Sequence, residues 1–433
     1  MGGGLLQLIY VGKEDLYLTG NPQMTYFKQV YRRYTNFSIE CIEQSFNKNP
    51  TVNESNVFSL ISKSGDLLKG LHLDLLFSEE DSGLSNGSYV NWTNNTGHAF
   101  IKRADFEIGS NIIDTHYGHW MDVWNELTDH NENEFSILNK HPRKDNSAYL
   151  QSNAATSLPE LQMYIPFKFW FTRNPGAALP LLALKYSEVK LKLQTRSLKA
   201  LINSDHGTGT IDYSTAPTCK LFGDYIFLDK QERRRFTSNR HEYLIEQVQY
   251  NKLTAATSIT LNFNHPVKEL IWTVQNTTVT QEVTTSGDID ATQNVLIGAD
   301  LALSNKNDYF CYDAKSDGGI SERLFGGKSF EGFTTMKLTF EGIDRFSARK
   351  ASYFGNFQPI ESGHKNPNNF IYCYSFALRP EDYQPTGTCN FTKIRSAKME
   401  FGSIQASSNI NIYAINYNML IIYGGTATLG YTR

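Results

Sequence analysis

Two short patterns in this chain have the spacing of known chemical sites. Gly83-Leu84-Ser85-Asn86-Gly87 matches the G-x-S-x-G nucleophile elbow, whose chemistry needs a strand that runs tightly into the serine and a helix that leaves it. An acidic loop and the stretch Ser88–Trp92 flank this pattern, so a polar loop is the better interpretation. Asp288-Ile289-Asp290 begins like a calcium-binding loop, but Gln293 stands where that loop requires glycine. Neither pattern therefore predicts a catalytic or calcium site.

A third group of residues has the types of a metal site. Its members are Asp114, His116, His119 and Asp122. If His116–Leu127 forms a helix, capped by Asp114 or Thr115, residues three apart share one face and could converge on a metal ion. Aromatic residues crowd the same segment, and no H-x-x-x-H pattern accompanies it. We expect a packed helix here and no bound metal.

The chain has five cysteines, an odd number, and none of them forms a C-x-x-C pair. They are Cys41, Cys219, Cys311, Cys373 and Cys389. Such usage fits reduced, buried thiols better than disulfides or a zinc site. We therefore predict no metal and no cofactor.

Two clusters mix cations with aromatic rings, which could stack nucleic-acid bases. They are Tyr31-Arg32-Arg33-Tyr34 and Arg233-Arg234-Arg235-Phe236. The chain as a whole has 41 Lys and Arg against 44 Asp and Glu, a formal net charge of −3, which gives no electrostatic footprint for nucleic acid. Arginine beside aromatic rings is also typical of protein interfaces. We predict that both clusters lie in protein contacts and that the chain binds no nucleic acid directly.

The elements that would position these residues are mainly strands. Val189–Leu193 and Met336–Phe340 alternate apolar with polar residues, the pattern of a strand with one wet face. Strands of this length between Gly-, Asn- and Pro-rich turns are typical of β-sandwiches, and an eight-stranded jelly roll is one candidate. Periodicity alone does not choose among the sandwiches.

An internal repeat predicts two such domains. Three pairs of similar phrases occur in the same order in each half, and they place Ile39 beside Ile245, Gly109 beside Gly342, and Ser187 beside Ser396. Each match is weak alone, but three in one order indicate duplication. We expect the members of each pair to lie on equivalent strands.

The first residues, MGGGLL, lack the charged region and apolar run of a signal peptide, so we expect synthesis in the cytosol. Four N-x-S/T sequons are the candidate glycosylation sites, Asn86, Asn91, Asn94 and Asn276. Since Asn and Thr are also common turn residues, and no secretion signal is present, ordinary cellular glycosylation is not expected.

Long phrases in both halves carry a family resemblance. They include DLYLTGNPQMTYFKQVYRRYTNF at Asp15–Phe37, DYIFLDKQERRRF at Asp224–Phe236 and NIYAINYNMLIIYGG at Asn411–Gly425. With these phrases the chain resembles the major capsid proteins of the nucleocytoplasmic large DNA viruses, most closely those of algal viruses. The resemblance implies an all-β fold of two consecutive eight-stranded jelly rolls with short helices in loops. It also implies a structural protein without catalysis, whose homotrimers form pseudo-hexagonal capsomers that tile an icosahedral shell.

The resemblance also divides the chain. We expect an amino-terminal arm at 1–24, a first jelly roll at 25–213, a linker at 214–223 and a second jelly roll at 224–433. The arm carries an apolar group and a turn, namely Leu5, Leu6, Leu8, Ile9, Asn21 and Pro22. Because glycines resist a fixed fold and Pro22 disfavours helix before it, the arm should run extended or turned.

In that family the arm lies on the inner side of the shell, beside minor capsid proteins or the inner viral membrane. The implied partners are further copies in the homotrimer, neighbouring capsomers, and minor capsid and penton proteins, within a virion capsid assembled from protein made in the host cytoplasm.

Two other classes of protein function stay open, a lectin and an enzyme. A carbohydrate-binding jelly-roll lectin would need a groove with exposed aromatics and often calcium ligands, of which no clean set is visible. A glycosidase or lyase on a β scaffold would need two carboxylates at a defined separation, which a sequence alone does not reveal.

Overall fold

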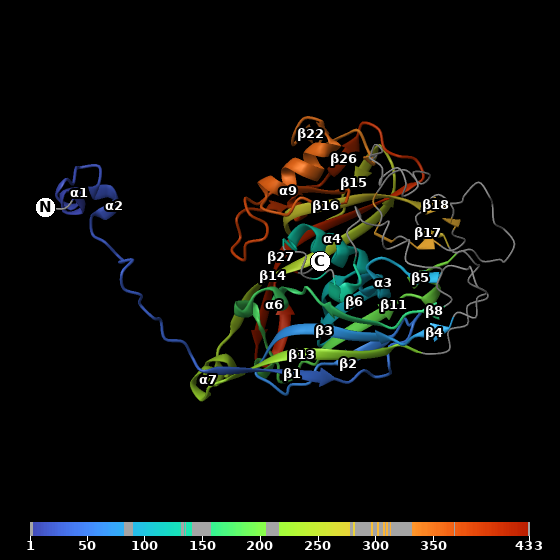
Figure 1. The fold of residues 1–433 in the computed structure, drawn as a ribbon, viewed down its shortest axis with the longest axis horizontal. Helices are drawn as coiled ribbons and strands as arrows, with labels where there is room; N and C mark the ends of the chain where they lie inside the picture. Colours follow the sequence, from blue (N-terminus) through green and yellow to red (C-terminus); the bar gives the residue numbers. More distant parts are fainter. Residues whose placement is uncertain are drawn as a thin grey trace. The chain divides into compact units, whose positions relative to one another are not determined.

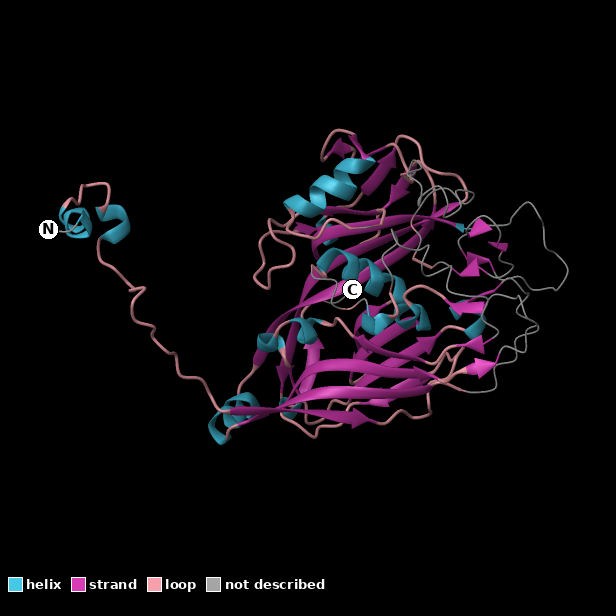
Figure 2. Ribbon diagram, viewed as in Figure 1, coloured by secondary structure: helices cyan, strands magenta, loops and turns pink. Residues whose placement is uncertain are grey.

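The chain forms two units, Met1–Phe37 and Ser38–Arg433. The computed structural model describes residues 3–81, 90–130, 134, 136–140, 157–204, 216–277, 280–281, 296–297, 301–302, 306–307, 309–310, 312, 331–367 and 369–431. Strands dominate the larger unit and short helices connect them (Figures 1 and 2). Among the described residues, no helix is both long and apolar enough to cross a membrane.

The smaller unit contains two short helices, α1 (Gly3–Ile9) and α2 (Leu16–Thr19), neither of which buries a side chain. The expectation of a wholly extended or turned arm is therefore wrong at α1, which contains Leu5, Leu6, Leu8 and Ile9. Leucine is a strong helix former, and the two described glycines occupy only the first turn. The predicted turn before Pro22 does occur. Helix α2 ends at Thr19 with Gly20 as its C-cap, and Asn21 takes a positive φ of 50°.

The first jelly roll consists of two sheets. One sheet has the order β1 (Phe37–Gln44), β13 (Thr218–Leu228), β3 (Leu67–Phe77) and β10 (Leu179–Pro180), and β9 (Leu161–Pro166) also pairs with β3. The other has the order β2 (Val57–Leu60), β11 (Val189–Thr195), β6 (Ile101–Ile108) and β7 (Asn111–His116). Buried and half-buried residues alternate along β11, as its sequence predicts.

The second jelly roll repeats this arrangement. One sheet has the order β14 (His241–Thr254), β27 (Ser408–Tyr423), β16 (Pro266–Asn276) and β24 (Ile371–Ser375), with β25 (Cys389–Asn390) on β16 and β28 (Thr426–Leu429) on β27. The other has the order β15 (Ser258–Thr260), β26 (Ala397–Phe401), β21 (Thr335–Phe340) and β22 (Ile343–Asp344), with β23 (Arg349–Lys350) on β21.

The strand orders confirm the predicted repeat. Ile39 lies on β1 and Ile245 on β14, which are the first strands of their jelly rolls and occupy the same edge of equivalent sheets. Gly109 and Gly342 both form the turn between the fourth and fifth strands, with φ of 65° and 82°, a region that favours glycine. Ser187 and Ser396 lie just before the equivalent strands β11 (Val189–Thr195) and β26 (Ala397–Phe401), so the expectation that this pair lies on the strands themselves is wrong.

The remaining elements are short. The helices are α3 (Thr96–Phe100), α4 (Gly118–Thr128), α6 (Trp170–Arg173), α7 (Lys230–Ser238), α9 (Gln358–Glu361), the π-helix η8 (Tyr353–Phe357) and the 3₁₀ turns η1 (Ser136–Leu138), η3 (Pro175–Ala177), η4 (Leu181–Ala183), η5 (Leu198–Leu201) and η9 (Phe391–Lys393). The minor strands are β4 (Glu80–Asp81), β5 (Val90–Trp92), β8 (Ser157–Leu158), β12 (Ile202–Ser204), β17 (Thr280–Gln281), β18 (Leu296–Ile297), β19 (Leu301–Ala302) and β20 (Lys306–Asn307).

The described part of the expected linker 214–223 lies largely in a strand. β13 pairs with β3 from Thr218 to Ile226 and continues to Leu228, so the last strand of the first jelly roll extends past residue 213. Helix α7 then leads directly to β14.

Candidate interface surfaces

The four residues considered as a possible metal group, Asp114, His116, His119 and Asp122, do not converge. Asp114 and His116 lie on β7, where the His116 Nε2 atom is 2.9 Å from the Asp114 carboxylate. The His116 ring stacks on Phe169 at 4.3 Å between centroids. His119 and Asp122 lie on α4, which confirms the predicted helix. Its N-cap is Tyr117, without a side-chain hydrogen bond, so the predicted cap at Asp114 or Thr115 is wrong.

Asp122 is held by a buried ion pair instead of a metal. Its Oδ1 lies 2.9 Å from Lys140 Nζ and accepts a hydrogen bond from Asn95 at 2.8 Å. Its Oδ2 accepts a hydrogen bond from the Tyr312 hydroxyl at 2.8 Å. Burial would raise the pKa of Asp122, but the charge of Lys140 and the hydrogen bonds from Lys140 and Tyr312 help to outweigh burial, and the pKa is lowered. This carboxylate therefore fixes α4 in place.

Helix α4 carries an aromatic contact between the two jelly rolls. The Trp120 ring lies 5.0 Å from that of Tyr413 on β27, and Tyr250 on β14 stacks on Tyr413 at 4.9 Å. His119 Nδ1 lies 2.8 Å from the Tyr413 hydroxyl, and burial lowers the pKa of His119 to about 3, so the ring is neutral. Trp120 and Tyr413 are fully buried. This packing sets the angle between the jelly rolls.

Polar contacts reinforce this junction. The Val248 backbone N–H on β14 donates to the Asp114 carboxylate at 3.0 Å, and the Gln247 side chain donates to the Ile113 carbonyl. The Arg173 guanidinium pairs with Glu246 at 2.7 Å. Each contact joins one jelly roll to the other.

A buried histidine lies close to this junction. His364 is 2.8 Å from Glu269 on β16 through Nε2 and 2.6 Å from Glu381 through Nδ1. Burial alone would lower the pKa of His364, but the two carboxylates outweigh it and raise the pKa to about 9. The Trp124 ring of α4 meets the His364 ring edge-on at 6.3 Å. The cluster thus links strands of the second jelly roll to the helix of the first.

The two predicted interface clusters differ in conformation. Tyr31, Arg32, Arg33 and Tyr34 have no regular secondary structure, whereas Arg233, Arg234, Arg235 and Phe236 lie on α7. Asp229 caps α7 by accepting a hydrogen bond from the Glu232 N–H at 2.8 Å. Arg233 pairs with the buried Asp66 at 3.0 Å and Phe236 packs on a small apolar cluster. Arg234 and Arg235 remain exposed.

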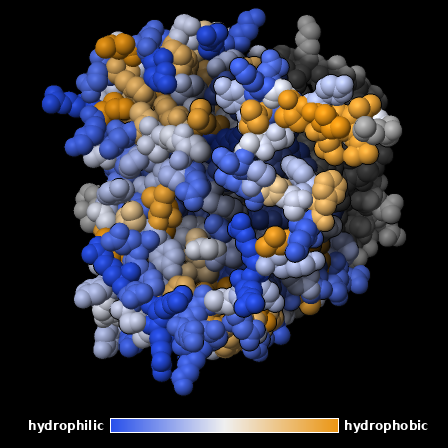
Figure 3. Space-filling model, turned by 90° about the vertical axis from the view of Figure 1, so that its left-hand side faces the viewer, coloured by the Kyte–Doolittle hydropathy of each residue, from blue (hydrophilic) through white to orange (hydrophobic). Residues whose placement is uncertain are grey.

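The most informative surface feature is a difference between repeated positions. Ile245 on β14 is fully buried in the core cluster formed mainly by the first jelly roll, while its repeat partner Ile39 on β1 is 50% exposed. Figure 3 shows one face of the molecule, on which hydrophobic side chains gather in groups among hydrophilic ones. Two further exposed apolar residues are Phe357 and Ile360, at 55% and 62%. The protein thus carries apolar side chains where a second surface could pack.

The cysteines only partly follow the prediction. Cys219 and Cys373 are buried and Cys389 is half-buried, but Cys41 on β1 is exposed, so the expectation of buried thiols is wrong at this position. β1 is an edge strand, and its odd-numbered residues face away from the core. Cys311 lies outside the described residues.

The remaining sequence candidates are mostly outside the described part of the chain. Gly83–Gly87, including Asn86, and Asp288–Asp290 lie there. Asn91 on β5 is half-buried and its Oδ1 accepts a hydrogen bond from the Trp92 N–H at 2.8 Å, and Asn94 is also half-buried. Asn276 ends β16. The expectation that these four sequons are candidate sites without ordinary cellular glycosylation stays a prediction.

Comparison with known proteins settles the family. The "Major capsid protein N-terminus" family matches residues 25–229, and the "Large eukaryotic DNA virus major capsid protein" family matches residues 232–428. The chain belongs to the major capsid proteins of large eukaryotic DNA viruses. The major capsid proteins of Phaeocystis pouchetii virus and Paramecium bursaria Chlorella virus 1 are each 35% identical to it, with 100% of both chains covered.

Solved capsid structures share the fold of this major capsid protein. PBCV-1 VP54, fitted into a reconstruction of the virophage Sputnik, has a TM-score of 0.75 at 30% identity and covers 94% of this chain and 100% of its own. A chain of the quasi-atomic model of the PBCV-1 virus capsid has a TM-score of 0.72 at 31% identity, with the same coverage. The Faustovirus major capsid protein, at 12% identity and a TM-score of 0.67 over 95% of this chain and 94% of its own, shares the fold alone.

These relatives confirm the predicted double jelly roll and the capsid function. The chain is a structural component of a virus capsid and not an enzyme, because its relatives are structural major capsid proteins. The lectin alternative finds no support among them. The surfaces described above are therefore candidates for contacts between capsid subunits.

Proposed function

We propose that three copies of this major capsid protein assemble into a capsomer with a pseudo-hexagonal outline. Two jelly rolls of the same strand order lie in each chain, so three chains supply six similar bodies. A closed three-fold ring lets every jelly roll contact the next one through a related surface. The contact between the two jelly rolls within one chain is already one of the six contacts in such a ring.

The single observation that carries the proposal is the contrast between Ile245 and Ile39. Both lie on the first strand of a jelly roll, at positions that the sequence repeat matches, yet Ile245 is fully buried against the first jelly roll and Ile39 is 50% exposed. A ring of six would cover the β1 surface of each chain with the second jelly roll of its neighbour. Ile39 would then gain the environment that Ile245 has within the chain.

A matching surface exists on the second jelly roll. Helix α4 follows β7 and precedes β9, and the η8–α9 segment follows β22 and β23 and precedes β24, so the two helical insertions are equivalent. Helix α4 packs on β27 through the buried Trp120. The equivalent segment exposes Phe357 and Ile360. We assign these two residues to the contact with the next chain.

The experiment compares substitutions on the two proposed surfaces. Ile39→Asp and Phe357→Asp each place a charge where the neighbouring chain would pack, and Ile343→Asp is the matched control on β22, where Ile343 is 74% exposed. A buried unpaired charge costs about 3 kcal/mol or more, so the dissociation constant should rise at least about 100-fold. Light scattering after size exclusion should give three times 49.2 kDa for the wild type and for the control.

The two outer variants should dissociate towards monomer at micromolar concentration, while the wild type resists dilution. A wild-type monomer of normal fold, or trimers that survive both substitutions, would contradict the proposal. Circular dichroism shows separately whether each variant still folds, so a folding failure is not mistaken for a lost interface.

We further propose that the capsomers tile an icosahedral shell, with neighbouring capsomers, minor capsid proteins and penton proteins as partners. The arm, including Leu5, Leu6, Leu8 and Ile9, would contact minor proteins or the inner membrane, and synthesis would take place in the host cytoplasm. Family membership supports this assignment. Electron microscopy of concentrated trimers tests it, because hexagonal arrays are expected and isolated, randomly arranged particles would argue against it.

We also propose a division of the chain into an arm and two jelly rolls. We place the arm at 1–24 as predicted but extend the first jelly roll through β13, so that α7 becomes the connection to β14. The pairing of β13 with β3 supports this change. Limited proteolysis should cut near Arg234 and Arg235, which are exposed on α7, before it cuts in β13.

A further inference from the structure

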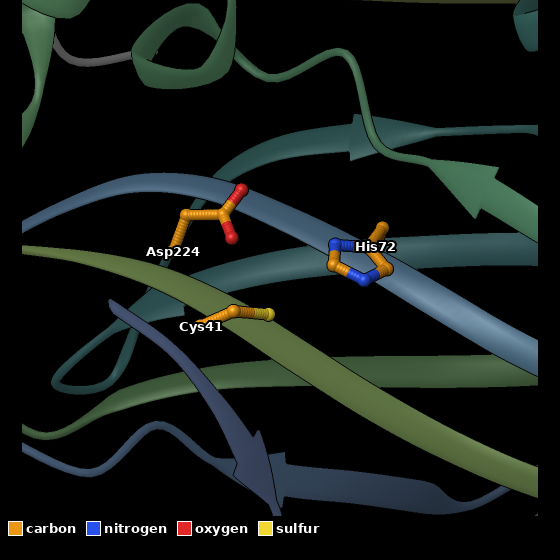
Figure 4. A group of neighbouring side chains, drawn as sticks. All are labelled: Cys41, His72 and Asp224. Carbon is orange, nitrogen blue, oxygen red and sulfur yellow. The ribbon is translucent and has the colours of Figure 1, made fainter. Parts of the chain in front are cut away.

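Three potential metal ligands meet on the outer face of the first jelly roll. Cys41 lies on β1, Asp224 on β13 and His72 on β3, which are neighbouring strands of one sheet. One ligand atom of each residue lies within 4.8 Å of those of the other two (Figure 4). The residues are 31 and 152 positions apart in sequence, 72 minus 41 and 224 minus 72, so only the strand pairing brings them together.

Local structure holds the three side chains on one face. Leu71 and Leu73 point into the core, so the residue between them, His72, points outward. The His72 ring stacks on Phe222 of β13, with 5.4 Å between centroids and an interplanar angle of 14°. This contact limits the orientations of the imidazole ring and so fixes one ligand before any metal arrives.

A glycine makes room for the carboxylate. Gly70 is the register partner of Asp224 across the β13–β3 ladder. A Cβ atom at Gly70 would lie 2.4 Å from the Asp224 Oδ2 atom, closer than van der Waals contact permits. The missing side chain thus lets the carboxylate lie across β3 on the side where His72 projects.

The donor set has the chemistry of a zinc-type ion. Thiolate, imidazole and carboxylate are all zinc ligands, whereas magnesium and calcium prefer oxygen donors only. In a tetrahedral zinc site the ligand atoms are roughly 3.3–3.8 Å apart, given the usual bond lengths. The separations here are at most 4.8 Å, so they exceed those values by at most about 1–1.5 Å, which side-chain rotations would close.

We propose that Cys41, His72 and Asp224 bind one divalent transition-metal ion of the zinc type per chain. The thiol binds as its thiolate and releases its proton to solvent, and a water molecule completes a tetrahedral coordination. An ion pair already links two of these strands, because Lys220 on β13 lies 3.7 Å from Glu43 on β1. The bound ion would link the three strands β1, β3 and β13, of which β1 is an edge strand.

The competing explanation is a hydrogen bond from the Cys41 thiol to the Asp224 carboxylate without any ion. The two explanations predict different numbers of bound metal ions per chain, one for the metal site and none for the hydrogen bond. Purified full-length protein, stripped with a chelator and dialysed against zinc, should retain about one zinc per chain by elemental analysis. With cobalt(II) as the probe, a thiolate-to-cobalt charge-transfer band and tetrahedral visible bands should appear.

Substitution of each ligand tests the assignment. Cys41→Ser should abolish the charge-transfer band, and His72→Gln and Asp224→Asn should each weaken cobalt affinity at least about tenfold. Cys389→Ser is the matched control, since it removes a half-buried thiol on β25 in the other jelly roll. Zinc retention that is unchanged in Cys41→Ser, or wild-type protein without retained zinc, would overturn the proposal.

A second measurement needs no variant. Zinc should raise the melting temperature of the chelator-treated wild type, because a ligand that binds the folded state stabilises it, whereas magnesium at the same concentration should not. Equal effects of zinc and magnesium would count against the site. All three ligands come from one chain, so binding does not need the trimer. Cys41 lies on the same face of β1 as Ile39, so the site would adjoin the proposed contact between chains, and light scattering reports the oligomeric state independently.

Discussion

The buried histidine beside the jelly-roll junction gives a quantitative prediction. We expect His364→Gln to lower the free energy of unfolding by about 3 kcal/mol at neutral pH. The rise in the pKa of His364 from its ordinary 6.5 to about 9 corresponds to this energy, at 1.36 kcal/mol for each pKa unit. The glutamine also leaves Glu269, which is fully buried, without its charged partner, and breaking a buried pair typically costs about 3–5 kcal/mol.

The sign of the pH dependence follows from the direction of the two pKa changes. Because the folded-state pKa of His364 is raised, its contribution is complete below about pH 6.5 and disappears as the pH rises through about 9. The pKa of Glu269 is lowered, since the effect of burial is outweighed by the charge and hydrogen bond of His364 together with the charges of Lys268 and Arg173. The contribution of Glu269 is therefore lost as the pH falls below the ordinary pKa of the group. The difference between wild type and His364→Gln should therefore be largest near pH 6–7 and shrink towards pH 10.

Urea unfolding followed by tryptophan fluorescence, at one fixed chain concentration and several pH values, measures this difference. His130→Gln is the matched control, because His130 lies 3.4 Å from the same Glu381 but its side chain is half-exposed, and exposed pairs contribute about 0–1 kcal/mol. A loss for His364→Gln that is the same at pH 6 and pH 10 would refute the argument. So would a control variant that loses as much stability as His364→Gln.

Two further predictions concern the junction and the arm. Trp120→Ala should lower the free energy of unfolding by about 3–5 kcal/mol, since it removes a fully buried ring from the contact with Tyr413; Leu378→Ala, at a residue that is 79% exposed, should change it by less than about 0.5 kcal/mol in the same thermal scan. Deletion of residues 1–15 should leave the melting temperature and the trimer unchanged but impair shell assembly in electron microscopy, because neither arm helix buries a side chain of its own. Loss of the trimer, or complete shells without the arm, would show that the arm has another role.

The sheet structure was predictable because its determinants are local. Alternation in Val189–Leu193 fixes which residues of β11 face the core, and the observed burial follows it residue by residue. The two equivalent turns could be paired from sequence because each contains a glycine at positive φ, although Gly109 is the first residue of its turn and Gly342 the second. The choice of a jelly roll over another sandwich depended on the family resemblance, since periodicity does not encode strand order.

The buried ion pairs were not predictable from sequence because they join residues that are far apart in the chain and meet only when strands pair. Glu269, His364 and Glu381 come from three separate segments and meet only after β16 and its neighbours pair. The exposed Cys41 shows the same limit, since an edge strand cannot be told from a central strand by its own residues. The repeated arginine phrases differ in conformation, because the cap at Asp229 and the packing of Phe236 make α7 a helix. The prediction that both clusters lie in protein contacts stays a prediction.

Duplication within a chain explains why equivalent residues need not have equivalent surroundings. Ile39 and Ile245 occupy the same place in the same fold, but the covalent connection supplies a neighbour for only one of them. An apolar side chain that is 50% exposed on an edge strand is a liability for a free monomer, because unpaired edges and apolar patches promote unspecific association. Retaining isoleucine at position 39 is consistent with a surface that a neighbouring chain covers. Assembly would then complete, in each of three chains, a contact that the fold has already made once.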